Sequence, residues 1–316
     1  MVLKRRRGFV YALVFQSYLN QKISLYDKAM NSQVKQVVAD KQSLDSLVST
    51  IRIPPRPSLL VEMQKELNKD DSDPRKLSRI IANDVAMAAS LMKLANSSFF
   101  GLRLKAQSVD HAVDLLGMRQ TGLVMTGIIA RQSIATQGPS LRKFWDISSK
   151  RAQALSAMVK RLPVCTSDVA HTFGLFCDIG VPILMERFPD YAQTWQKANN
   201  SFELALTAVE DEQHFTNHAS IGSLMARTWG LPEQVSTSIL LHHDYPSLED
   251  TATDESVRGL IALTALAEYA IQKYEGQESS SEWFKSSERV CQFLGIGIHD
   301  AEDWCDELQD LFNQAH

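Results

Sequence analysis

The chain has 316 residues, of which 44% are hydrophobic and 22% are charged, and its formal net charge at pH 7 is −4. This composition is ordinary for a soluble globular protein, and the length suggests one large or two moderate domains. The net charge argues against a protein built overall to coat nucleic acid, although a local basic face is compatible with it. The four cysteines have no CxxC spacing, so we expect reduced, mostly buried thiols in a cytoplasmic protein.

The N-terminus combines a basic segment, Lys4–Arg7, with the short apolar run Phe9–Phe15. This order resembles the start of a signal peptide, but no small-residue cleavage site follows the run. The run is also far shorter than the ~20 residues that cross a bilayer. We therefore expect no membrane span. A packed or partner-binding helix is favoured here over secretion or an amphipathic helix on a membrane surface.

Apolar residues recur at helical spacing along nearly the whole chain, without convincing strand alternation, repeats or long low-complexity runs. Residues 9–50 follow this pattern, and the prolines of Ile53–Pro57 then interrupt it and mark the start of a domain. Asp73, Asp84 and Ser108 are suited to cap the helices that follow them, and Gly117 to end one. Further helices are predicted over residues 58–67, 118–135, 144–162, 167–178, 183–188, 202–213, 217–229, 233–243, 257–274, 288–294 and 301–314. Residues 245–255 are predicted to form a loop, and residues 275–281 a linker. The sequence thus predicts an all-α protein.

Residues 108–135 have the pattern of two helices joined by a glycine turn, which a DNA-binding helix-turn-helix would also show. A DNA reader needs Lys and Arg on and around its second helix to contact phosphates. Arg119 and Arg131 are nearly alone there, among many apolar residues. We therefore interpret the pair as a packing element and expect no nucleic-acid partner.

Asp178 stands in an apolar stretch, His171–Leu184, where a buried carboxylate would require a cation, a metal or hydrogen-bond donors. His218 and His242 share helical faces with apolar residues and are predicted to point into the interior. Either histidine could hydrogen-bond to Asp178 without any metal. Adjacent helical residues point about 100° apart, so His242, His243 and Asp244 are not expected to face one site together.

Several motifs follow one another from about Leu47 to about His243. The most specific is Leu91–Leu102, LMKLANSSFFGL. The others are IPPRP at 53–57, SVDHAVDLLG at 108–117, the pair Phe144-Trp145, the run Gly174–Leu184, His218, WGLP at 229–232 and His242-His243. Together they resemble the motifs of the HDOD family, the "HD-related output domain" of bacterial signalling proteins.

The resemblance implies two helical lobes, an N-terminal helical bundle over residues 47–140 and a degenerate HD-superfamily helical domain over residues 141–275. Residues 1–46 and 276–316 are then helical extensions. It also implies a regulatory role, usually without catalysis. Catalytic HD proteins bind metal through a set of histidine and aspartate ligands, and this set is incomplete in this chain. The first histidine corresponds to Ile147, the His–Asp pair to Cys177 and Asp178, and the distal aspartate to Glu268, while His218 and His242 remain.

This erosion bears directly on chemistry, because hydrolysis in that superfamily needs divalent metal to activate water and polarise phosphate. Isoleucine has no lone pair to offer. A Cys177 thiolate with Asp178 and His218 or His242 could bind zinc, but it suits Mg²⁺ or Mn²⁺ poorly. No Gly-rich phosphate loop or G-x-S-x-G element offers another chemistry. We expect no cofactor and no metal; if a metal binds, those four residues are its predicted ligands.

The leading hypothesis is a non-catalytic signalling module that binds a protein or small-molecule partner through its helical lobes. The alternative is a residual metal-dependent phosphohydrolase acting on nucleotides or cyclic dinucleotides. Phe99 and Phe100 are candidate partner contacts, although packing between the lobes is the favoured role for them. A homo-oligomer is compatible with the sequence.

Overall fold

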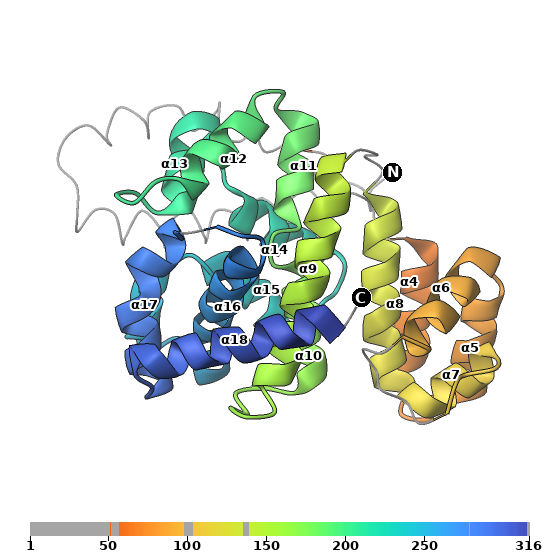
Figure 1. The fold of residues 1–316 in the computed structure, drawn as a ribbon. Coiled ribbons are helices and arrows are strands. Elements are labelled where there is room, and N and C mark those ends of the chain that lie inside the picture. The colour runs from red at the N-terminus through yellow and green to blue at the C-terminus, as the bar shows by residue number, and fades with distance from the viewer. Residues whose placement is uncertain (1–50, 52–56, 98–103, 135–138, 278, 315–316) are drawn as a thin grey trace. The chain divides into compact units, whose positions relative to one another are not determined.

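The structure is a computed structural model that describes residue 51 and residues 57–97, 104–134, 139–277 and 279–314. The predicted N-terminal extension, residues 1–46, lies outside the described residues. All the regular elements within the described ranges are helices, which confirms the predicted all-α class. Residues 52–316 form one compact unit, and Figure 1 traces its helices in chain order.

The first half of this unit consists, in its described residues, of five helices, three of which begin at a side-chain cap. They are α4 (Ser58–Leu67), α5 (Pro74–Ala82), α6 (Val85–Ala95), α7 (Val109–Leu116) and α8 (Met118–Ser133). Asp73, Asp84 and Ser108 each accept a hydrogen bond from a backbone N–H in the first turn of α5, α6 and α7, as predicted. Gly117 separates α7 from α8 with a φ of 77°, a conformation that favours glycine.

The second half is a helical bundle around the long helix α16. It contains α9 (Pro139–Met158), α10 (Ser167–Phe176), α11 (Gly180–Arg187), α12 (Tyr191–Asn199), α13 (Leu206–His214), α14 (His218–Thr228), α15 (Glu233–Leu241), a short 3₁₀ helix η1 (Tyr245–Leu248), α16 (Glu255–Tyr274), α17 (Ser281–Leu294) and α18 (Ile298–Gln314). Helix α16 is buried on all sides from Leu260 to Ala267 and packs against α9, α15, α17 and α18. A helix that is apolar all round belongs in a core.

Helices α10 and α11 form a long apolar stretch. The segment Ser167–Arg187 is long and apolar enough to cross a membrane by length and composition, but 83% of its most apolar window is buried inside the protein. It packs against α9, α14 and α15. Its composition is therefore that of a core segment.

Several boundaries differ from the predicted ones. Helix α12 was not predicted, because its buried face consists of Tyr191, Thr194 and Ala198 and lacks a strong apolar stripe. Helix α15 ends at Leu241 and not at His243. Helix α17 begins at Ser281, where Ser280 accepts a hydrogen bond from the Trp283 N–H, instead of at Glu288. All four cysteines are free, and Cys177, Cys291 and Cys305 are buried, as expected.

The N-cap of α14 offers a first test of how much such capping residues contribute to stability. The Asn217 side chain accepts a hydrogen bond from the Ser220 N–H at 2.8 Å and donates one to Asp211 at 2.8 Å. We expect Asn217→Ala to lower the free energy of unfolding by about 1 kcal/mol, the usual cost of losing an N-cap. Urea unfolding followed by circular dichroism measures it. Asn200→Ala, at an exposed side chain that bonds only its own helix, is the control and is expected to change stability by no more than about 0.5 kcal/mol.

Candidate functional site

The site is centred on Asp178, in the turn between α10 and α11. Gly180, two residues later, lets this turn approach α14 closely: a Cβ atom at this position would lie 2.1 Å from the carbonyl oxygen of His218. A side chain larger than hydrogen is therefore incompatible with the contact. The close approach brings Asp178, which is only 7% exposed, next to the first residue of α14.

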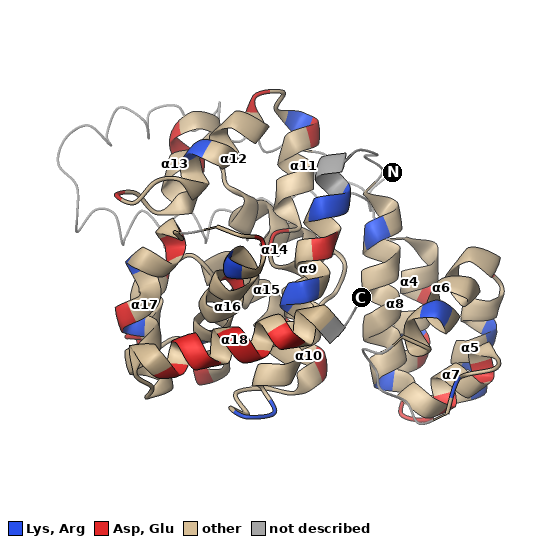
Figure 2. Cartoon of the chain, viewed as in Figure 1, with Lys and Arg blue, Asp and Glu red and all other residues tan. Residues whose placement is uncertain are grey.

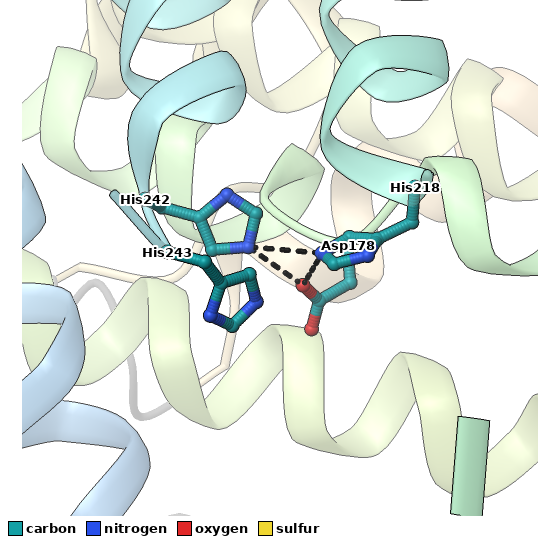
Figure 3. Close-up of side chains that lie close together, drawn as sticks. All are labelled: Asp178, His218, His242 and His243. Atoms are coloured by element: carbon teal, nitrogen blue, oxygen red, sulfur yellow. Dashed lines mark hydrogen bonds and ion pairs between the residues drawn. The ribbon is translucent and has the colours of Figure 1, made fainter. Parts of the chain in front are cut away.

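Two histidines converge on one oxygen of this carboxylate (Figure 3). The Nε2 atoms of His218 and His242 lie 3.1 Å apart, and they lie 3.6 and 3.3 Å from Oδ1 of Asp178. Both rings are almost fully buried, as their helical faces predicted. The structure thus brings Asp178, His218 and His242 together.

The second nitrogen of each ring is held by an acceptor. Nδ1 of His242 donates to the backbone carbonyl of Ile239 at 2.7 Å. Nδ1 of His218 donates to Glu210 at 2.7 Å, and the same carboxylate accepts the hydroxyl of Tyr191. A neutral imidazole with its proton on Nδ1 has only a lone pair at Nε2. Nε2 of each ring is therefore the nitrogen directed at Asp178. Burial lowers the pKa of His242 to about 3, which keeps its ring neutral.

His243 also faces the cluster, although the sequence analysis did not include it among the site residues. Its ring centroid lies 4.0 Å from that of His242 and 5.1 Å from that of His218. Its Nδ1 donates to Glu282 at 2.7 Å. Both histidines follow Leu241, where α15 ends. The Asp244 side chain is exposed, so His242, His243 and Asp244 do not all face one site, as expected.

Arg151, on α9, is the cation that compensates Asp178. Its guanidinium donates to Oδ2 of Asp178, and its Nε lies 3.2 Å from Glu268 of α16. Arg151 is 2% exposed. Burial alone would raise the pKa of Asp178, but the charge of Arg151 holds it well below its ordinary value. Burial raises the pKa of Glu268, against the opposing effect of Arg151. Sequence reasoning did not identify Arg151.

The remaining predicted pocket residues lie on the Arg151 side of Asp178. Ligand atoms of Cys177, Asp178 and Glu268 lie within 4.8 Å of one another, and Ile147 lines the same cavity as Asp178 and Glu268. Cys177 is fully buried, and burial raises the pKa of its thiol well above the ordinary value, so it is a thiol and not a thiolate. Among the described residues, Cys177 does not group with the histidines as the predicted zinc set required. Phe99 and Phe100 lie outside the described residues.

A cavity of about 640 Å³ opens above Asp178 and Arg151. Its wall includes apolar and aromatic side chains such as Phe144, Met185 and Trp195, and its rim carries amides and hydroxyls. His243 Nε2 and two guanidinium nitrogens of Arg151, Nε and Nη1, are buried without a hydrogen-bond partner among the described residues, and both residues line the cavity. A volume of this size lies within the range of small-molecule sites.

The paired metal ions implied by the HD resemblance do not fit these residues. Ile147 has no lone pair for the first ligand position, and Cys177 remains a thiol in the second. Between Asp178 and Glu268 the required positive charge is already supplied by Arg151. A divalent ion at that place would lie against a guanidinium, and their repulsion in a buried site is large.

Comparison with known proteins identifies the family. A family model for the HDOD domain matches residues 53–245, more than half of the chain. A curated relative, an uncharacterized protein of Treponema pallidum (strain Nichols), is 24% identical over 230 residues, which cover 71% of this chain and 43% of the relative. The chain therefore spans less than half the length of the curated relative it matches.

Solved structures share the fold. A protein from Shewanella amazonensis SB2B, provisionally named a phosphohydrolase, matches with a TM-score of 0.65 and 21% identity over 87% of this chain and 94% of its own. A Geobacter sulfurreducens HDOD domain protein of unknown function matches with a TM-score of 0.63 and 18% identity, over 88% of this chain and 99% of its own. With the family match over residues 53–245, the chain belongs to the HDOD family.

Proposed function

We propose that this chain is a non-catalytic regulatory module that binds a partner molecule and does not turn over a phosphoester. The observation that carries the proposal is the buried Arg151, which is paired with both Asp178 and Glu268. Metal-dependent phosphoester hydrolysis requires an ion with an open coordination position for water. The guanidinium supplies charge to the carboxylates but offers no such position.

The cavity above Arg151 supports the binding part of the proposal. It combines apolar walls with a few buried polar groups that lack partners, a combination typical of small-molecule sites. We favour a small molecule bound there, which would bias the packing of the helices that line the cavity, α9, α11, α12 and α16. The same regulatory role could instead depend on a protein partner that binds elsewhere on the helical lobes.

Nucleic acid is a disfavoured partner for this module. The side chains of α8 that a helix-turn-helix would present are largely buried, including Val124, Met125 and Ile129. Acidic residues also dominate α18 (Figure 2), which would repel phosphate. The buried residues of α8 support an interpretation of α7 and α8 as packing elements.

A residual phosphohydrolase is the second candidate function, because Asp178 and three histidines gather in one place. An assay separates the two candidates. The purified chain is incubated with bis(p-nitrophenyl) phosphate, a cyclic dinucleotide or a nucleoside triphosphate, each with Mg²⁺, Mn²⁺ or Zn²⁺. We expect the turnover of the wild type to equal that of Asp178→Ala. Turnover by the wild type that this substitution abolishes would establish the phosphohydrolase instead.

The binding proposal has its own test in a variant that fills the cavity. Ile147 is half-buried and lines the cavity, so Ile147→Trp is expected to block it. Native mass spectrometry of protein purified from its own cells should show a small molecule on the wild type and none on the variant. Val85→Trp, at an exposed position of α6, is the matched control. A wild-type chain that carries nothing, or equal loads on all three proteins, would contradict a small-molecule partner in the cavity.

A further inference from the structure

The carboxylates that line the cavity are balanced by positive charges of this chain itself. The four lining carboxylates are those of Asp178, Glu268, Glu275 and Glu282. Among the described residues, the lysine and arginine side chains within ion-pair distance of them are also four, namely Lys143, Lys150, Arg151 and Lys285. A ligand therefore meets no surplus of lysine, arginine or carboxylate charge. Because burying a charge without a partner is costly, this balance favours an uncharged ligand.

Two atoms of the lining side chains are buried without a hydrogen-bond partner among the described residues, and they differ in kind. Nη1 of Arg151 can only donate, and the side-chain oxygen Oε1 of Gln272 can only accept. Both residues line the cavity, on helices α9 and α16, which pack against each other. We propose that the cavity binds an uncharged amide or lactam, whose carbonyl oxygen accepts from Arg151 and whose N–H donates to Gln272. This inference rests on the proposed binding function and adds the chemical class of the ligand.

An amide group matches this donor and acceptor better than a charged group does. It carries an acceptor oxygen and a donor nitrogen on the same carbon atom, without net charge. A carboxylate offers only acceptors, so it would leave Gln272 unpaired and would bring a further negative charge into the cavity. An ammonium offers only donors and would leave Nη1 of Arg151 unpaired. Both are expected to bind more weakly, because an unpaired buried polar atom is costly.

The apolar part of the cavity wall fits a flat body joined to that amide. Phe144 from α9 and Trp195 from α12 contribute aromatic rings, and Ile147 and Met185 add aliphatic surface. Aromatic side chains pack favourably against another ring, edge to face or offset. The cavity volume of about 640 Å³ also admits a molecule larger than a single ring.

Two further amides at the end of α12 offer acceptors to the same ligand. The side-chain nitrogen of Asn199 donates to the backbone carbonyl of Trp195 at 2.8 Å, and that of Asn200 donates to the carbonyl of Gln196 at 3.0 Å. Both asparagines line the cavity. With their nitrogens bonded within the helix, their side-chain oxygens can accept from a ligand. This favours a ligand that carries N–H groups over one that carries only acceptors.

Benzamide, benzoate and benzamidinium test the inference, because they share one ring and nearly one shape but differ in charge. Each is titrated onto the full wild-type chain at pH 7, and binding is followed by ligand-observed NMR. We expect benzamide to bind about 10-fold more tightly than either charged probe. Ile147→Trp should abolish benzamide binding, and Val85→Trp, at an exposed position of α6, should retain it.

Gln272→Leu tests the proposed acceptor without removing a charged side chain. Leucine keeps much of the volume of glutamine but has no oxygen, so benzamide should bind about 5-fold more weakly, the usual effect of one hydrogen bond. Benzoate has no N–H to donate, so its affinity should not fall. Gln193→Leu, at an exposed glutamine of α12, is the matched control and should bind benzamide as the wild type does. Circular dichroism of each variant verifies that it is folded.

The outcomes separate this inference from the proposed function on which it rests. If benzoate or benzamidinium binds as tightly as benzamide and loses binding in Ile147→Trp, the amide class is overturned and the cavity remains a small-molecule site. Equal benzamide affinities of the wild type and folded Gln272→Leu would also overturn the class. So would a wild type that binds none of the three probes, whereas a molecule found on that chain by native mass spectrometry would still support the proposed function.

Discussion

Replacing Arg151 with methionine should destabilise the protein by about 3–5 kcal/mol, the usual cost of removing one partner from a buried ion pair. Arg151 is 2% exposed and contacts both Asp178 and Glu268. Without the guanidinium the two carboxylates remain buried, close together and without their shared cation. Methionine retains much of the packing of the arginine side chain, so the loss of stability would come mainly from removal of the positive charge. The free energy of unfolding in urea measures the effect.

A surface pair provides the matched control. Arg289 lies 2.8 Å from Glu249, but the two side chains are 43% and 63% exposed. Arg289→Met should therefore change stability by only about 0–1 kcal/mol. The double variant Arg151→Met/Asp178→Asn should recover part of the loss, because it removes one of the two uncompensated charges. Equal effects of Arg151→Met and Arg289→Met would show that the buried pair does not compensate Asp178.

The second large effect is expected from Gly180→Ala, which should cost about 3 kcal/mol or more. The added Cβ would lie 2.1 Å from the carbonyl oxygen and 2.8 Å from the Cα of His218. These are backbone atoms of α14, so the clash is relieved only by separating α11 from α14. That movement would also draw His218 away from Asp178.

Gly127→Ala in α8 is the corresponding control. There the added Cβ would meet only the end of the Leu175 side chain, at 2.7 Å, which a rotamer change can move. Alanine is also favoured over glycine by about 1 kcal/mol within a helix. We expect this variant to lie within about 1 kcal/mol of the wild type. The close packing of α11 on α14 would be disproved if Gly180→Ala unfolded at the same urea concentration as Gly127→Ala.

Local sequence signals predicted the helices well where capping and apolar spacing agree. Asp73, Asp84 and Ser108 cap their helices as expected. Helix α12 was not predicted, because its buried positions include Tyr191 and Thr194 and show no run of aliphatic residues. The division into lobes at about residue 140 stays a prediction.

The site was predictable only in part, because some of its contacts join residues that are far apart in the sequence. His218 and His242 were placed correctly in the interior because helical periodicity reports which face is buried. Arg151 was missed because its partners are distant in sequence, and an arginine on a helix is usually exposed. His243 was not predicted as a site residue, and it lies beyond Leu241, where α15 ends and helical spacing no longer indicates the direction of a side chain. Its partner Glu282 could not be found from local spacing.

Anomalous diffraction from crystals grown with zinc and with manganese would test the loss of the paired-metal site most directly. The account predicts that no pair of ions binds around Asp178 and that Arg151 stays in contact with Asp178 and Glu268. Two ions sharing the carboxylate of Asp178, with the Arg151 guanidinium displaced from it, would contradict the account.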